Sequence, residues 1–242
     1  MPKKSLVRLL KLFLLCVLAA GANFLFNTLS VYSIKIPLFL DTVFNAAVCF
    51  AVGLIPGIVT ALMSYIVIGI RNGSFDPFVL CAITEVLLVW LLKPSTLGPS
   101  VSGPSKHINY SKRGSAGQQP ERMELHLSAL PETALTSFIS VFARLMVLYV
   151  VCCIVISILG GVIDFLYYTI WANSKQYFSA EDTFKIGLLR SGIPVLAMNI
   201  LSRIPVNLVD RFIVIFGGYF ISRGISRLMR LKIPADLAPQ HP

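Results

Sequence analysis

Two acidic residues lie within apolar stretches of this chain, and each follows a proline. Asp41 stands in IPLFLDTVF, four residues after Pro37, and Asp210 stands in IPVNLVDRF, five residues after Pro205. A carboxylate in an apolar stretch is costly unless it meets a cation, a hydrogen-bond donor or the free amide groups of a helix start. Ligand contact and helix-start capping explain the two acids equally well, and both explanations stay open.

Amide side chains and an arginine accompany these acids. Asn45 lies one helical turn after Asp41; Asn207 lies three residues before Asp210, and Arg211 directly follows it. Directional polar groups between apolar walls are typical of a small-molecule site. We therefore predict substrate contacts from Asp41, Asn45, Asn207, Asp210 and Arg211. The two acids favour a ligand with a cationic or N–H-rich group, unless Arg211 cancels that preference.

Glu85 and Arg144 are two further charged residues within apolar stretches. An acid and a base that are both inside a bilayer are favoured as a pair, since either one alone is expensive to bury. We therefore predict a structural ion pair between Glu85 and Arg144 that joins the two halves of the chain. The alternative is a role for Glu85 in binding a coupling ion or a substrate.

Motifs for catalysis and metal binding are absent from the sequence. It contains no G-x-x-x-x-G-K-[ST], H-E-x-x-H or G-x-S-x-G pattern. The histidines lie in polar segments, and the five cysteines lie in apolar stretches without a C-x-x-C pattern, which favours a role as small core residues. We therefore expect no catalytic residue, no metal and no cofactor, and predict that the protein is not an enzyme.

The composition is that of an integral membrane protein. Of the 242 residues 56% are hydrophobic and 13% are charged, whereas soluble domains average about 25% charged residues. The apolar residues form blocks near bilayer length, which favours helical spans over a barrel. The net charge of +10 comes mostly from basic residues at the ends of these blocks. We therefore expect contact with the lipid bilayer and none with nucleic acid.

The apolar blocks predict an all-helical protein with six transmembrane helices. The expected spans are Leu6–Phe26, Pro37–Gly53, Pro56–Ile70, Pro77–Leu92, Thr136–Ile163 and Ile204–Ile225. The second to fourth are shorter than the roughly 20 residues of a straight crossing, so tilt or local thinning is expected. The apolar stretch Ile186–Ser202 contains Gly192-Ile193-Pro194, which interrupts a helix. We predict that it lies across the outer face or re-enters from it.

Clusters of Lys and Arg precede the first span, follow the fourth and follow the sixth. The positive-inside rule therefore predicts a multi-pass protein of the inner (cytoplasmic) membrane with both termini in the cytoplasm. The chain then divides into a four-span half (1–92), a disordered cytoplasmic linker (93–133), a two-span half (134–228) with an outer-face element (165–203), and a cytoplasmic tail (229–242). The linker is rich in Pro, Ser, Gly and Gln, which cannot bury a core.

The stretch PLFLDTVFNAAVCFAVGLIPGIVTALMSYIV resembles the second and third helices of the substrate-binding membrane subunits, or S components, of energy-coupling factor (ECF) vitamin transporters. IPVNLVDRFIVIFGGYFIS, near the end of the chain, gives weaker support. Two features depart from the family. The A-x-x-x-A docking pattern of the first helix is absent, with Cys16-x-x-x-Ala20 as its nearest equivalent, and the linker after the fourth span is longer.

The resemblance implies that the chain binds a small, water-soluble, vitamin-like nutrient from outside, as the S component of an ECF-type ABC transporter. It also implies three protein partners, which are a transmembrane coupling subunit and two ATPase subunits. Two alternatives remain open. One is a membrane-embedded receptor that signals to a separate partner, because a similar pattern occurs in the membrane sensor domains of bacterial histidine kinases. The other is a membrane scaffold whose linker recruits partners.

Overall fold

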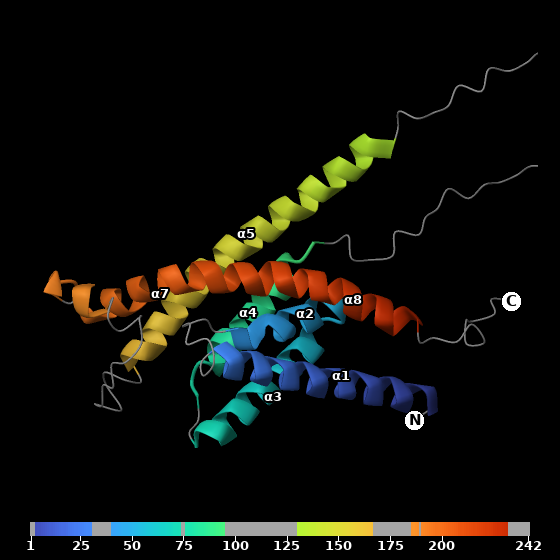
Figure 1. Cartoon of the computed structure of the whole chain (residues 1–242), viewed down its shortest axis with the longest axis horizontal. Helices are drawn as coiled ribbons and strands as arrows, with labels where there is room; N and C mark the ends of the chain where they lie inside the picture. Colours follow the sequence, from blue (N-terminus) through green and yellow to red (C-terminus); the bar gives the residue numbers. More distant parts are fainter. Residues whose placement is uncertain are drawn as a thin grey trace, which may run out of the picture.

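The computed structural model describes residues 3–30, 40–73, 76–94, 130–166, 185–188 and 190–231. All regular structure in this part of the chain is helical, which confirms the predicted fold class. In chain order, the elements are α1 (Lys3–Thr28), η2 (Leu40–Thr42), α2 (Val43–Ala51), α3 (Leu54–Asn72), α4 (Val79–Leu92), α5 (Leu130–Asp164), α7 (Val195–Phe212), η5 (Ile213–Gly217) and α8 (Gly218–Leu231). Figure 1 shows their arrangement as a helix bundle.

Four helical segments in the described residues are long and apolar enough to cross a membrane. They are Leu9–Thr28, Leu54–Asn72, Phe138–Asp164 and Val195–Met229. Large apolar side chains such as Leu10 are exposed on these helices, as expected of surfaces that face lipid rather than water. The chain is therefore a multi-pass membrane protein. The apolar helices Leu40–Ala51 and Val79–Leu92 are shorter, so the full set of six spans stays a prediction.

The last long helix begins earlier than the sequence predicted. It starts at Val195 rather than at Ile204, and α7, η5 and α8 continue one another to Leu231. In Figure 1 they form one long helix, coloured orange to red, which α5 crosses. The predicted outer-face element therefore needs a correction, because its residues from Val195 onward belong to this long helix. Residues 167–184 of that element lie outside the described residues.

The predicted break at Gly192-Ile193-Pro194 is confirmed. Gly192 has a φ of +75°, a conformation that glycine adopts without steric cost, and Pro194 directly precedes the first residue of α7. Proline cannot continue a helix backwards but fits its start, so this sequence both ends the preceding turn and begins the span.

The fifth helix also begins earlier than predicted, at Leu130 rather than Thr136. The last residues assigned to the linker are therefore helical. The rest of that linker, from residue 95 to residue 129, and the tail after residue 231 lie outside the described residues.

Small residues let the helices approach one another closely. Short α2 packs against α1, α3, α4 and α8, and its residues Ala46, Ala47 and Cys49 are completely buried. A Cβ atom added at Gly218 of α8 would lie 3.1 Å from the Cβ of Ala46. All five cysteines are buried and free, as predicted for small core residues. Such contacts are typical of helix association in membranes.

At Gly161, α5 approaches α7 closely. A Cβ atom at this position would lie 2.7 Å from the Cα and 2.8 Å from the backbone nitrogen of Ile200. Because both are backbone atoms, α7 as a whole would have to move away. Glycine is therefore required here by packing.

We expect Gly161→Ala to destabilise the protein by about 1–3 kcal/mol, because an inserted methyl group in a packed interface forces a backbone shift. The matched control is Gly21→Ala in α1, where no atom lies within 4 Å of the added Cβ. That change should be neutral or stabilising by up to about 1 kcal/mol. Unfolding of both variants in mixed detergent micelles measures the difference. Equal stability of the two variants would contradict the close α5–α7 packing.

Candidate functional site

A cavity of about 210 Å³ lies near the ends of α1 and α3 and the starts of η2 and α4. Residues from the last third of α5 and from the middle to the end of α7 also line it. Its wall carries five charged side chains, from Asp41, Arg71, Asp76, Arg203 and Arg211. Apolar and aromatic side chains complete it, among them those of Tyr65, Phe78 and Ile156. A few polar groups between apolar walls are what a small-molecule site requires.

The cavity brings together part of the predicted substrate-binding set. Asp41, Asn207 and Arg211 line it, although they come from η2 and α7, far apart in the sequence. Asn45 and Asp210 do not line it, and their exposed fractions are 1% and 0%. The predicted residues therefore divide into three that face the cavity and two that lie within the surrounding protein.

Arg211 is the centre of a buried ion cluster. Its Nη1 is paired with Glu85 Oε2 on α4, and its Nη2 donates to the carboxylate of Asp210 on its own helix. Nη1 also lies 3.4 Å from the Thr42 hydroxyl oxygen, to which it donates. The planar guanidinium group offers several donors at fixed angles, so one arginine can pair with two carboxylates at the same time. The cluster thereby joins α4 to α7.

The partner of Glu85 is therefore not the one that the sequence predicted. Glu85 is paired with Arg211, whereas Arg144 is exposed on α5. Hydropathy gives the depth of a residue in a span but not the side of the helix on which it lies. A base of similar depth on the inward side of another helix was the better partner for Glu85, and the sequence pattern does not distinguish the two.

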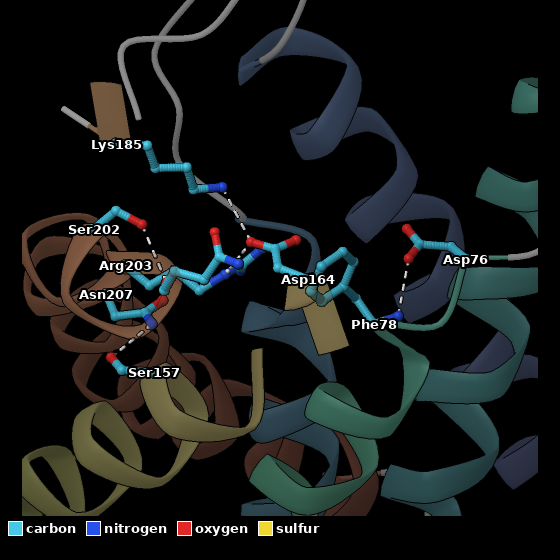
Figure 2. A network of polar contacts seen from close by, with 9 residues as sticks. Asp76, Phe78, Ser157, Asp164, Lys185, Ser202, Arg203 and Asn207 are labelled. Carbon is cyan, nitrogen blue, oxygen red and sulfur yellow. Dashed lines mark hydrogen bonds and ion pairs between the residues drawn. The ribbon is translucent and has the colours of Figure 1, made fainter. Parts of the chain in front are cut away.

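A second ion cluster lies at the edge of the cavity (Figure 2). Arg203 Nη2 and Nε donate to Asp164 Oδ2 at 2.8 and 3.0 Å, and Lys185 Nζ donates to the same oxygen at 3.1 Å. The Arg203 guanidinium also lies 4.5 Å from the centre of the Phe78 ring. These contacts join the end of α5 to α7 and to the turn before α4.

Asp164 was not among the predicted site residues, although one feature of the sequence pointed to it. Asp164 is the last residue of α5, where the helix dipole disfavours an acid. An acid at the end of a helix is therefore expected to pair with a cation from another element. Ser157, which accepts a hydrogen bond of 2.9 Å from the Asn207 amide, was also missed, because a serine in an apolar helix carries no such signal.

Arg71 holds the ends of α1 and α3 together at the cavity. Its Nη1 donates to the Thr28 hydroxyl at 2.9 Å and its Nη2 to the Asn27 side-chain oxygen at 2.8 Å. Arg71 is in the last turn of α3, where the helix dipole favours a cation. The cavity is thus bounded by three arginines, and each of them contacts more than one element.

Asn45 belongs to a polar network between helices rather than to the cavity wall. The Asn23 amide donates to the Asn45 oxygen at 2.8 Å and to the Ser64 hydroxyl at 3.0 Å. The backbone N–H of Phe44 donates to the Asn23 oxygen at 3.0 Å. Because these residues come from α1, α2 and α3, the network fixes how those helices meet.

The two aspartates of the cavity wall differ in their surroundings. Asp76 Oδ1 accepts a 2.9 Å hydrogen bond from the backbone N–H of Phe78, which caps the turn before α4. Burial raises the pKa of the Asp76 carboxyl, while the Phe78 N–H and the Arg203 charge oppose that rise. Asp41 is 4% exposed, and its Oδ1 has no hydrogen-bond partner among the described residues.

A double-mutant cycle tests the pairing of Glu85 with Arg211. Glu85→Gln and Arg211→Gln should each cost about 3–5 kcal/mol of stability, because each leaves a buried charge without its partner. The double variant should cost about 1–3 kcal/mol less than the sum of the two. The measurement is unfolding in mixed detergent micelles.

The matched cycle replaces Arg211→Gln with Arg144→Gln. Arg144 is exposed, so its change should cost less than about 1 kcal/mol and should add to that of Glu85→Gln. Coupling of Glu85 to Arg144, with none to Arg211, would instead support the pair that the sequence predicted.

In the part of the chain that the structure describes, no group of three or more His, Cys, Asp or Glu side chains is placed to hold a metal ion. Comparison of the chain with protein-family models, curated proteins and solved structures found no match. The cavity and its charges are therefore the features that bear on function.

Proposed function

We propose that this chain is the substrate-binding S component of an ECF-type transporter that takes up a small, water-soluble nutrient. The observation that supports this most is the charged cavity within an apolar helix bundle. Charged side chains are costly in such a bundle, and those that face a cavity are the usual mark of a ligand or ion pathway. The cavity, of about 210 Å³, is smaller than the roughly 300–1,000 Å³ of most ligand pockets, so it suits a small ligand.

The direction of binding follows from the order of the helix ends. The cavity lies near the end of α1 and beside the first half of the long helix formed by α7, η5 and α8, whereas the first residues of α1 and the last of α8 lie at the opposite end of the bundle (Figure 1). Basic residues cluster at that opposite end, which the positive-inside rule assigns to the cytoplasm. In the inner (cytoplasmic) membrane, the cavity would then receive its ligand from outside.

Energy for uptake comes from other chains in this proposal. The sequence carries no nucleotide-binding motif, so two ATPase subunits and a transmembrane coupling subunit supply ATP hydrolysis. Cys16 and Ala20, the nearest equivalent of the family's docking pattern, are buried, and the Cys16 thiol contacts the backbone oxygen of Pro56 on α3 at 3.6 Å. Cys16 therefore contacts α3, and because both residues are buried, we do not assign the docking surface to them.

Affinity purification of the full chain from its native membrane in mild detergent tests the proposal. Mass spectrometry of the eluate should identify a coupling membrane subunit, two ATPases and a retained small molecule. A multi-pass protein of unrelated sequence with the same tag is the control. Recovery of a histidine kinase without ATPases would favour the receptor alternative. Recovery of several unrelated proteins with no retained molecule would favour the scaffold.

A further inference from the structure

Acids outnumber bases in the buried cluster beside the cavity. Glu85 and Asp210 are both paired with Arg211, and Asp41 lies within electrostatic range of Arg211 and Asp210. The exposed fraction of each of these four residues is 4% or less. Three carboxyl groups therefore share one guanidinium group. Uncompensated charge in such surroundings is strongly unfavourable, so the cluster favours any further group that brings positive charge.

Asp41 is the acid of this cluster that a ligand reaches. Asp41 and Arg211 line the cavity, whereas Glu85 and Asp210 lie behind them and do not. Asp41 Oδ1 is a buried acceptor without a hydrogen-bond partner among the described residues. A buried carboxylate oxygen without a donor is costly, and it strongly favours a donor supplied from the cavity.

The bases of the cavity wall leave this preference in place. Arg211 is already shared by Glu85 and Asp210, and Arg203 donates to Asp164 together with Lys185. Arg71, the third base of the wall, donates to the neutral Asn27 and Thr28. Over the two clusters and the cavity wall, acids still outnumber bases by five to four; the acids are Asp41, Asp76, Glu85, Asp164 and Asp210, and the bases are Arg71, Lys185, Arg203 and Arg211. Tyr65, whose side chain interacts with the Asp41 carboxyl, adds an aromatic ring to the wall, and such a ring is compatible with a cation. The ring of Phe78 is already covered by the Arg203 guanidinium.

We propose that the ligand carries an ammonium or similar N–H cation that donates to Asp41 Oδ1. This inference rests on the proposed function, because it assigns a chemical class to the ligand of the same cavity. The alternative is that Asp41 is protonated and has only a structural role. A neutral Asp41 would give a cationic ligand no advantage in affinity over a neutral one.

Three probes with one ring and different charge separate these cases. They are benzylamine, which is a cation at neutral pH, benzyl alcohol, which is neutral, and benzoate, which is an anion. Binding to the purified full chain in detergent is measured as a rise in Tm with probe concentration. Benzylamine should bind best, and Asp41→Asn should weaken its binding by about tenfold or more, because the variant removes the charge and keeps the shape.

The matched control is Asp76→Asn. Asp76 also lines the cavity, but its Oδ1 accepts the Phe78 N–H, and asparagine can accept the same hydrogen bond. Loss of the Asp76 charge should weaken benzylamine binding less than Asp41→Asn does, by about threefold against about tenfold, because the Asp76 carboxylate already has a donor in the protein. An equal loss in both variants would show a general charge effect and would overturn the role of Asp41.

Other outcomes also decide the proposal. Preference for benzoate or benzyl alcohol, absence of benzylamine binding, or full binding by Asp41→Asn would each overturn it.

The proposed function is tested separately by the copurification experiment. If a coupling subunit and ATPases copurify with the chain while benzylamine does not bind, the transporter stands and only the cationic ligand is wrong. If neither ATPases nor a retained molecule is recovered, the transporter itself is wrong, whatever the probes do.

Discussion

Arg211 holds the carboxylates of Glu85 and Asp210, and both acids are buried in the bundle. Pairing stabilises charges in such a place only when every partner is present, because removal of one leaves the others uncompensated. The pair with Glu85 therefore fixes α4 against α7, and the remaining edge of the arginine forms part of the cavity wall. The same contacts that allow the bundle to bury charge also shape the cavity.

The other two arginines of the wall act in a similar way on other helices. Arg71 joins the ends of α3 and α1 through Asn27 and Thr28, and Arg203 joins α7 to the last residue of α5. Each arginine is a rigid donor held by more than one element, so contacts within the protein fix its place in the cavity wall. A site that is formed in advance loses less conformational entropy when a ligand binds.

The sequence predicted the features that composition and local sequence patterns determine. Apolar blocks gave the all-helical membrane fold, and Gly192-Ile193-Pro194 gave the break before the last span. It did not predict which side of a helix faces the bundle, so Glu85 was assigned to Arg144 instead of Arg211. The start of α7 was also missed, since Pro194 reads equally as a breaker and as the residue before a helix.

Close packing and charge pairing depend on each other in this bundle. Gly160 lies one turn before Asp164 on α5, and a Cβ atom added there would lie 3.0 Å from Arg203 Nη1 and 3.3 Å from its Nε. The missing side chain therefore leaves the space through which the guanidinium group crosses α5 to reach the carboxylate. Gly161, beside it, allows the backbone of α7 to come near enough for that reach. Small residues along α5 therefore have two roles: they allow the helices to pack closely, and they bring the buried charges within pairing distance.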